Sequence, residues 1–293
     1  MSNEECIAIN ANGVEYLEFS CLLPPWIEAL YSDVEKNYNP VVVLHWMQAN
    51  PFIPIAACLL YGIFIVLGTK YFSTREPWNW RSQMALWNLG LSLFSFCGML
   101  RTAPQLIYNL STMSLRDNLC IDPQITYGSG STGLWVQLFI LSKFPELIDT
   151  FFIVIHKKKL IFLHWYHHVT VLLYCWHSYV TTSPSGLFFV TMNYSVHAIM
   201  YGYYFLMAIK MKPKWFNPII VTVAQISQMF VGVTVTLIAA YHYKYDEDDC
   251  QIQKENNVAA FIMYGSYLFL FLQFFIGRYF KDKKIKVTKA KKV

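Results

Sequence analysis

Three histidines lie close together in the apolar stretch LIFLHWYHHVTVLLY, which covers residues 160–174. His164, His167 and His168 share one face of a helix, because residues three and four positions apart lie on the same side. Imidazole is a common metal ligand, and it is also a nucleophile and a proton carrier near neutral pH. The HxxHH pattern therefore indicates either a metal site or a site at which histidine transfers an acyl group or a proton.

Polar residues in three other apolar segments fall at the same depth as these histidines. Ionisable side chains inside a membrane are costly, so each one is a candidate for a functional role. At a rise of about 1.5 Å per residue, the residues lie roughly 9 to 18 Å from the cytosolic ends of their helices. Any one of them alone could be structural, but their shared depth predicts a common site. The set is Lys143, Glu146, Asp149, His167, His197, Gln225 and Gln228, with Asn193, Tyr201 and Tyr204 on the helix face of His197.

The segments that position these residues are long apolar runs. The chain of 293 residues is 55% hydrophobic and only 14% charged, whereas soluble domains contain about 25% charged residues. This composition predicts an all-α, polytopic integral membrane protein with seven transmembrane helices. The predicted spans are Pro51–Thr69, Ser82–Leu100, Thr132–Ile155, Leu160–Tyr179, Gly186–Ala208, Asn217–Ala240 and Val258–Tyr279.

The distribution of Lys and Arg predicts the orientation. With seven spans, seventeen of them fall on the side of the C-terminus and five on the other side. The positive-inside rule then places the C-terminus in the cytosol and the N-terminus in the lumen. We expect a lumenal or interfacial segment at 1–50, a membrane domain at 51–280 and a basic cytosolic tail at 281–293. The net charge of +5 reflects this bias and does not indicate nucleic-acid binding.

The loops contain candidates for covalent modification. Cys120 and Cys250 both fall in lumenal loops, where an oxidising compartment permits a disulfide between them. Cys21, Cys58, Cys97 and Cys175 lie in or beside apolar segments and are expected to be small core residues. The sequon at Asn109 lies in the same lumenal loop as Cys120 and is a candidate for glycosylation. His45, His156, His177 and His242 fall near membrane boundaries and are expected to be interfacial.

Three classes of function remain open from the residues alone: a metal-dependent enzyme, an acyl-transfer enzyme and a lipid-binding or transport protein. Membrane di-iron desaturases and hydroxylases use several histidine clusters, whereas this chain has one cluster and His197. A mononuclear metal site with three histidines and a carboxylate is a further alternative. Acyl transfer would use imidazole as nucleophile and general base, within an apolar chamber that is open to the cytosol. A lipid-binding or transport protein without chemistry is the third possibility.

Four blocks of the sequence are similar, in order and spacing, to the signature blocks of the ELO family of very-long-chain fatty acid elongases. They are KFPELIDT (143–150), HWYHH (164–168), MNYSVHAIMYGYY (192–204) and TVAQISQM (222–229). The resemblance extends over roughly residues 75–284, and the wording of the blocks is closest to the branch that extends saturated and monounsaturated chains. The final residues KAKKV resemble a dilysine retrieval signal of the endoplasmic reticulum, with Lys289 and Lys291 in the matching places.

The resemblance implies a 3-ketoacyl-CoA synthase of the endoplasmic reticulum membrane, which condenses acyl-CoA with malonyl-CoA and releases carbon dioxide. It implies that His167 accepts the acyl group, that His164 and His168 orient it, and that His197 assists from the opposite helix. The polar shell is then Lys143, Glu146, Asp149, Asn193, Tyr201, Tyr204, Gln225 and Gln228. No metal or cofactor is expected. The expected partners are the two substrates, membrane lipid, the ketoreductase, dehydratase and enoyl reductase of the cycle, and a second copy of the chain. We further expect the acyl chain to extend toward the lumenal half, beside Phe188 or Phe189.

Overall fold

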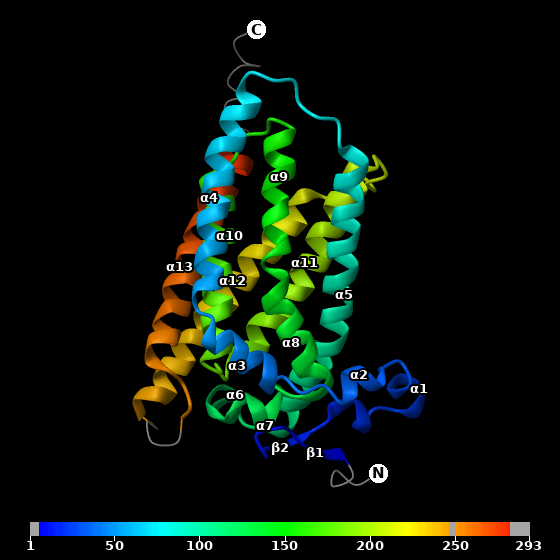
Figure 1. Cartoon of the computed structure of the whole chain (residues 1–293), viewed down its shortest axis with the longest axis vertical. Helices are drawn as coiled ribbons and strands as arrows, with labels where there is room; N and C mark the ends of the chain where they lie inside the picture. The colour runs from blue at the N-terminus through cyan, green and yellow to red at the C-terminus, as the bar shows by residue number, and fades with distance from the viewer. Residues whose placement is uncertain (1–5, 246–249, 282–293) are drawn as a thin grey trace.

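A computed structural model describes residues 6–245 and 250–281, and it has a helix at each of the seven predicted segments (Figure 1). The helices are α4 (Phe52–Ser73), α5 (Arg81–Thr112), α8 (Gly130–Ser142) with α9 (Ile148–Ile155), α10 (Phe162–Val180), α11 (Gly186–Ala208), α12 (Pro218–Tyr245) and α13 (Lys254–Ile276), which continues into a π-helical turn at Gly277–Lys281. Lys289 and Lys291 lie outside the described residues. The prediction of a mostly helical chain is therefore confirmed, with the third segment divided between two shorter helices.

The outer surface of the bundle is apolar, whereas many of its buried residues are polar. On α4, for example, Phe52, Leu59 and Leu60 are all more than 60% exposed. Within the described residues, four helices are long and apolar enough to cross a membrane: α4, α5, α12 and α13. Helices α10 and α11 are also long, but their histidines and other polar residues lower their mean hydropathy. This surface is that of a multi-pass membrane protein.

The third predicted segment is broken, although the sequence predicted one continuous span. Helix α8 ends at Ser142, and a 3-10 turn at Pro145–Leu147 connects it to α9. The backbone N–H groups of Lys143 and Phe144 already donate three residues back, to Ile140 and Leu141. Pro145 has no N–H group and cannot continue the α-helical ladder. The break lies at the motif residues Lys143 and Glu146, and both are buried.

The second segment is longer than predicted, and this corrects the placement of Asn109. Helix α5 continues past Leu100 to Thr112, so Asn109 lies in a helix rather than in a loop. Its side chain is 4% exposed, and its Oδ1 accepts a hydrogen bond of 2.8 Å from Gln105 Nε2. A glycan on Asn109 has no room in this structure. The last turns of this helix contact the N-terminal residues and the following loop: the Tyr108 ring centroid lies 5.7 Å from that of Phe19, and Asn118 Nδ2 donates to the Asn109 carbonyl oxygen at 3.2 Å.

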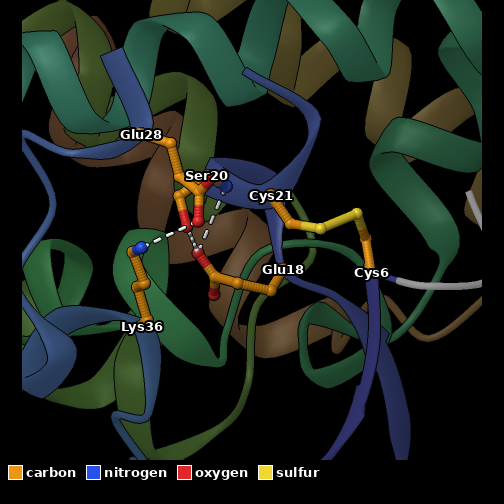
Figure 2. Close-up of a disulfide and its surroundings, with 6 residues drawn as sticks. All are labelled: Cys6, Glu18, Ser20, Cys21, Glu28 and Lys36. Carbon is orange, nitrogen blue, oxygen red and sulfur yellow. Dashed lines mark hydrogen bonds and ion pairs between the residues drawn. A yellow bond between two sulfur atoms is a disulfide. The ribbon is translucent and has the colours of Figure 1, made fainter. Parts of the chain in front are cut away.

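Residues 6–50 form a folded unit, which we call the N-terminal module. It contains an antiparallel hairpin of β1 (Ile7–Ile9) and β2 (Glu15–Leu17), so the protein is not strictly all-α. Three helices follow: α1 (Pro25–Glu28), α2 (Asp33–Lys36) and α3 (Val41–Ala49). Figure 2 shows that Cys21 is bonded to Cys6 and that Lys36 forms an ion pair with Glu28, at 2.8 Å. Cys21 is therefore not the free core residue that its apolar neighbours suggested.

Two carboxylates, Glu18, which is buried, and Glu35, which is partly buried, attach the N-terminal module to the bundle. Glu18 accepts hydrogen bonds from the backbone N–H and the hydroxyl of Ser131, at 3.0 and 2.6 Å. These groups lie in the first turn of α8, where an anionic partner is favourable. Gly130 has a φ of 61°, and a side chain there would overlap the Glu18 carboxylate. Glu35 accepts hydrogen bonds from Arg101 Nε and Trp135 Nε1, at 2.9 and 2.7 Å.

A second disulfide joins the loops at the same end of the bundle. Cys120, at the end of α6 (Leu115–Cys120), is bonded to Cys250, which precedes α13. This is the pairing that the sequence predicted. The free cysteines differ from the expectation of a common core role, because Cys175 is buried, Cys58 is half-buried and Cys97 is exposed on α5.

The bundle has two different ends, which Figure 1 shows as its bottom and its top. We call the lower end the capped end, since the N-terminal module, α6 and α7 (Pro123–Thr126) cover it. We call the upper end the basic end, since its loops and helix termini contain Lys70, Arg81, Lys157, Lys158 and Lys210. Between the two ends, α5 and α11 pack closely against each other. At Gly98 of α5 a side chain would overlap the ring of Tyr194 on α11.

Candidate active site

Helix α10 presents its histidines to the interior of the bundle, near the basic end. His164 and His168 lie one turn apart, with ring centroids separated by 4.5 Å. His164 Nε2 is 2.9 Å from Thr150 Oγ1, and Thr150 is in turn 2.6 Å from the hydroxyl of Tyr61 on α4. The Nδ1 atom of His168 is buried and has no hydrogen-bond partner among the described residues. His164 is therefore oriented by its neighbours, and His168 has a polar atom available for a ligand.

The ring of His167 is oriented by contacts rather than by hydrogen bonds. It lies 5.0 Å from the ring of Tyr267 and 5.5 Å from that of His168, measured between centroids. Tyr267 also donates a hydrogen bond of 3.2 Å to the His167 carbonyl oxygen, and its hydroxyl lies 2.5 Å from Thr170 Oγ1. No hydrogen bond occupies the His167 ring nitrogens within the described part of the chain. They are free to attack a substrate or to accept a proton.

A buried ion pair lies beside the histidines at the break between α8 and α9. Lys143 Nζ lies 2.6 Å from Glu146 Oε1 and donates to Asn193 Oδ1 at 3.3 Å. The same carboxylate oxygen is 4.0 Å from His197 Nδ1 on α11. Glu146 Oε2 is buried without a hydrogen-bond partner in the described structure. The motif carboxylate thus links the lysine of one helix to the histidine of another.

Asp149 is held by two donors from neighbouring helices. Tyr201 on α11 donates to Asp149 Oδ2 at 2.6 Å, and Trp87 on α5 donates to Oδ1 at 2.6 Å. The His197 ring packs edge-on against Tyr201, with centroids 5.2 Å apart. The Asp149 carboxylate therefore orients Tyr201, which in turn positions the His197 ring.

These residues surround a large cavity, which we call the polar cavity. Its volume is about 830 Å³, and helices α5, α9, α10, α11, α12 and α13 line it. Eleven of the twelve predicted catalytic and polar-shell residues lie on its wall, and Lys143 lies behind Glu146 and Asn193. The eleven are His164, His167, His168, His197, Glu146, Asp149, Asn193, Tyr201, Tyr204, Gln225 and Gln228. The residues that the sequence places at one depth are therefore close together in the structure, around one cavity.

The contribution of individual wall residues differs. Gln228 is buried, whereas Gln225 is only partly buried and donates to the Met200 sulfur at 3.1 Å. Tyr204 lines the cavity although the residue as a whole is 44% exposed.

Several residues that sequence reasoning passed over also line this cavity. Arg81, His156 and Lys158 lie at the basic end, and Trp87 and Asn88 lie deeper along α5. Asn88 could have been predicted from its depth in the second segment, since it is a polar residue in an apolar run. His156 was interpreted as interfacial, but its ring reaches the cavity while its Nδ1 is 2.8 Å from the Phe152 carbonyl oxygen. The contact of Trp87 with Asp149 has no sequence signal, because it depends on how α5 packs beside α9.

A second, smaller cavity of about 80 Å³ lies toward the capped end, and we call it the chamber. Asn193 lines both the chamber and the polar cavity. From there the wall follows α10 past Val171 and Cys175 to Ser178, and the lining is mostly apolar. Over these residues α10 rises by roughly 10 Å. The two cavities together suit a molecule with a large polar part and a thin apolar tail.

The described residues show no group of three or more His, Cys, Asp or Glu side chains arranged to bind a metal ion. Among the four histidines of the polar cavity, His164 is hydrogen-bonded to Thr150 and His197 lies beside Glu146, whereas the ring of His167 packs against Tyr267. The geometry therefore favours imidazole as nucleophile or base.

Comparison with known proteins gives a consistent result. The sequence profile of the ELO (GNS1/SUR4) family matches residues 46–287. The chain is 40% identical to very long chain fatty acid elongase 6 of Rattus norvegicus over 258 residues, which is 88% of this chain and 96% of that protein. It is 41% identical to very long chain fatty acid elongase 4 of Trypanosoma cruzi over 265 residues, or 89% of this chain and 90% of that protein. It is 38% identical to elongase 6 of Drosophila melanogaster over 84% of this chain and 78% of the other.

Proposed function

This chain belongs to the ELO (GNS1/SUR4) family of fatty acid elongases, and on that premise we propose that it is a 3-ketoacyl-CoA synthase. In this reaction a long-chain acyl-CoA and malonyl-CoA yield a 3-ketoacyl-CoA two carbons longer, together with CoA and carbon dioxide. The wording of the four sequence blocks further favours saturated and monounsaturated acyl chains. Membership in this family counts against the desaturase or hydroxylase alternative.

One observation supports this function above all others. Four histidines from two helices line a cavity that reaches the basic end, and a smaller, mostly apolar chamber lies toward the capped end and shares Asn193 with it. An acyl-CoA needs both environments, because its CoA part contains phosphates and its acyl part is a long alkyl chain. Arg81 and Lys158 on the wall favour phosphate groups by their charge.

The first step is transfer of the acyl group to His167. A ring nitrogen attacks the thioester carbonyl carbon, the carbon–sulfur bond breaks, and the thiolate leaves as CoA after taking the imidazole proton. His168 Nδ1 lacks a partner and can donate to the developing oxyanion in the tautomer with a proton there. His164 is held by Thr150 and fixes the packing of His168 beneath His167.

The second step is condensation. Malonyl-CoA loses carbon dioxide, and the electron pair of the broken bond attacks the acyl carbon. The carbon–nitrogen bond to His167 breaks, and a proton from water restores the neutral imidazole. His197, next to Glu146 and Tyr201, is placed to stabilise the enolate that forms. Lys143 neutralises Glu146 and so keeps the buried carboxylate from repelling the substrate. No metal or further cofactor takes part in these steps.

The membrane arrangement is part of the proposal. All seven segments span the membrane, with the basic end in the cytosol and the capped end in the lumen. The location is the endoplasmic reticulum, where the ketoreductase, dehydratase and enoyl reductase of the cycle act on the product. Replacing Lys289 and Lys291 with alanine should allow the protein to move from the endoplasmic reticulum to the membranes of other organelles. Unchanged localisation would remove the retrieval signal from the proposal.

The function is tested with purified protein, radiolabelled malonyl-CoA and a panel of acyl-CoAs. We expect a labelled 3-ketoacyl-CoA two carbons longer than the acyl-CoA supplied, and full activity in the presence of a strong metal chelator. Oxygen-dependent desaturation without chain extension would overturn the proposal. Binding of acyl-CoA with no turnover would leave a lipid-binding protein.

The covalent step has its own test. Acyl-CoA alone should release CoA in an amount limited by the enzyme and add the acyl mass to the protein, as measured by intact-protein mass spectrometry. His167→Ala should abolish both the adduct and elongation. His177→Ala is the matched control, because His177 is an exposed histidine on the same helix. An enzyme that elongates normally but never gains the acyl mass would leave His167 as a general base in a ternary complex.

A further inference from the structure

The far end of the chamber is closed by residues that precede the family match. Pro40, Val41 and Leu44 line it from the N-terminal module, whereas the match to the family profile begins at residue 46. Val41 and Leu44 lie one turn apart on α3 and are only 5% and 8% exposed. Tyr127, in the loop after α7, completes the closure and is 7% exposed. We call Val41, Leu44 and Tyr127 the floor of the chamber.

The floor is attached to both the bundle and the N-terminal hairpin. Tyr127 donates a hydrogen bond of 2.6 Å to the Ser183 carbonyl oxygen, between α10 and α11. Gln48 of α3 donates to the Val180 carbonyl oxygen at 2.9 Å, next to the end of α10. Gly130 N–H donates to the Tyr38 carbonyl oxygen at 3.0 Å, just before α3. Because these bonds connect α3 to the ends of the chamber-lining helices, the floor cannot move freely along the chamber axis.

The N-terminal hairpin supports α7 from the other side. Asn12 and Asn10 donate to Gln124 Oε1, at 2.8 and 3.4 Å. Asn10 lies between Cys6 and Cys21, whose disulfide closes the loop that contains the hairpin. The segment outside the family match is thus built as a rigid support for the closed end of the chamber.

We propose that the floor sets the maximum acyl chain length of this enzyme, with Val41 and Leu44 contributed by the N-terminal module and Tyr127 by the loop after α7. The inference rests on the proposed function, because it requires that the acyl chain occupy the chamber with its methyl end toward the capped end. In a closed apolar pocket one methylene more or less changes the rate about 10- to 200-fold. The side chains at the floor therefore determine the longest acyl chain that the chamber accommodates.

The test compares two neighbouring valines of the same helix. Val41 faces the chamber, whereas Val42 is 73% exposed and faces away from it. The measurement is the relative rate of elongation for a series of saturated acyl-CoAs that differ by two carbons. Val41→Phe should reduce the rate for the longest accepted chain at least about tenfold relative to a chain two carbons shorter. Leu44→Ala should shift the limit toward longer chains, and Val42→Phe should leave the profile of the wild type.

Relative rates within one preparation do not depend on how much of a variant folds, so partial misfolding does not obscure the result. A second measurement uses an acyl-CoA with a photoreactive diazirine at its methyl end, followed by peptide mapping. Crosslinks at residues 40–44 or 127 are expected in the wild type. Suppose that the wild type elongates, that Val41→Phe has the same maximum chain length, and that the crosslinks map elsewhere. The proposed role of the floor is then overturned, and the proposed function stands. If the wild type yields no extended product, the proposed function itself fails.

Discussion

At the scale of single residues, the Lys143–Glu146 pair is the most constrained feature of the site. Both side chains are almost completely buried, and Lys143 Nζ also lies 4.0 Å from the centroid of the Phe139 ring. Ser142 Oγ donates to the same Glu146 oxygen at 3.0 Å. Two charges in such a place depend on each other, because neither could lose its partner without leaving an unpaired charge inside the protein.

This dependence predicts a strong energetic coupling between the two residues. Lys143→Met should destabilise the protein by about 3–5 kcal/mol, since Glu146 would then be an unpaired buried carboxylate. Combining Lys143→Met with Glu146→Gln should recover a large part of that loss, because glutamine is neutral and still accepts the Ser142 hydrogen bond. Melting temperatures of the two single variants and the double variant in detergent form the cycle. Additive effects would contradict the coupling.

At the scale of elements, α11 connects the polar cavity to the chamber. Its residues His197 and Asn193 lie at the histidine cluster, whereas Val190 and Phe189 line the chamber nearer the capped end. Phe188, one position earlier, belongs to the same core cluster between α11, α12 and α13 as Phe189, Met229 and Tyr264, but it does not line the chamber. Neighbouring phenylalanines on one helix therefore have different surroundings.

This difference separates two substitutions that the sequence could not distinguish. Phe189→Ala should widen or lengthen the chamber and shift the preferred product toward longer chains. Phe188→Ala should lower stability by about 3–5 kcal/mol as a core truncation, with no change in preferred length. Product lengths from the same acyl-CoA series, together with melting temperatures, provide the comparison. An equal shift in length for both variants would show that the chamber is not the acyl site.

At the scale of the whole molecule, the N-terminal module is attached by charged contacts to the capped end. Glu35 on α2 accepts hydrogen bonds from Arg101 and Trp135, and Arg101 also stacks over the Tyr31 ring at 3.9 Å from its centroid. Burial alone would raise the pKa of Glu35. The hydrogen bonds from Arg101, from Trp135 and from the Ser32 backbone outweigh it, so the pKa of Glu35 is lowered.

The sign of this shift predicts how acid affects the attachment. A carboxyl group with a lowered pKa in the folded state contributes stability above its unfolded pKa, and that contribution is lost as the pH falls through the folded value. The wild type should therefore melt at a higher temperature than Glu35→Gln at pH 7, and the difference should shrink below about pH 4. A difference that stays constant from pH 7 to pH 3 would show that the charge of Glu35 is not what attaches the module.

The orientation of the molecule is a further prediction at this scale. In sealed microsomes, added protease should remove the C-terminal tail, whereas the N-terminal module should stay intact until detergent opens the vesicles. The reason is the excess of Lys and Arg at the basic end. Antibodies against peptides from the two termini follow the cleavage without tags that would cover the terminal lysines. Protection of the C-terminal peptide would reverse the orientation and place the mouth of the polar cavity in the lumen.

The sequence by itself predicted the helical segments and which polar residues gather around the polar cavity. Long apolar runs predict helices from composition alone, and the 3.6-residue period with a known rise brought Lys143, Glu146, His167 and His197 to one depth. Tertiary structure decided the rest. The pairing of Cys6 with Cys21, the burial of Asn109 in an extended α5 and the contact of Trp87 with Asp149 each join groups whose meeting depends on packing between elements. The closure of the chamber by α3 is of the same kind, because hydropathy records how deep a residue lies along a helix and contains no information on which segment covers the end of the bundle.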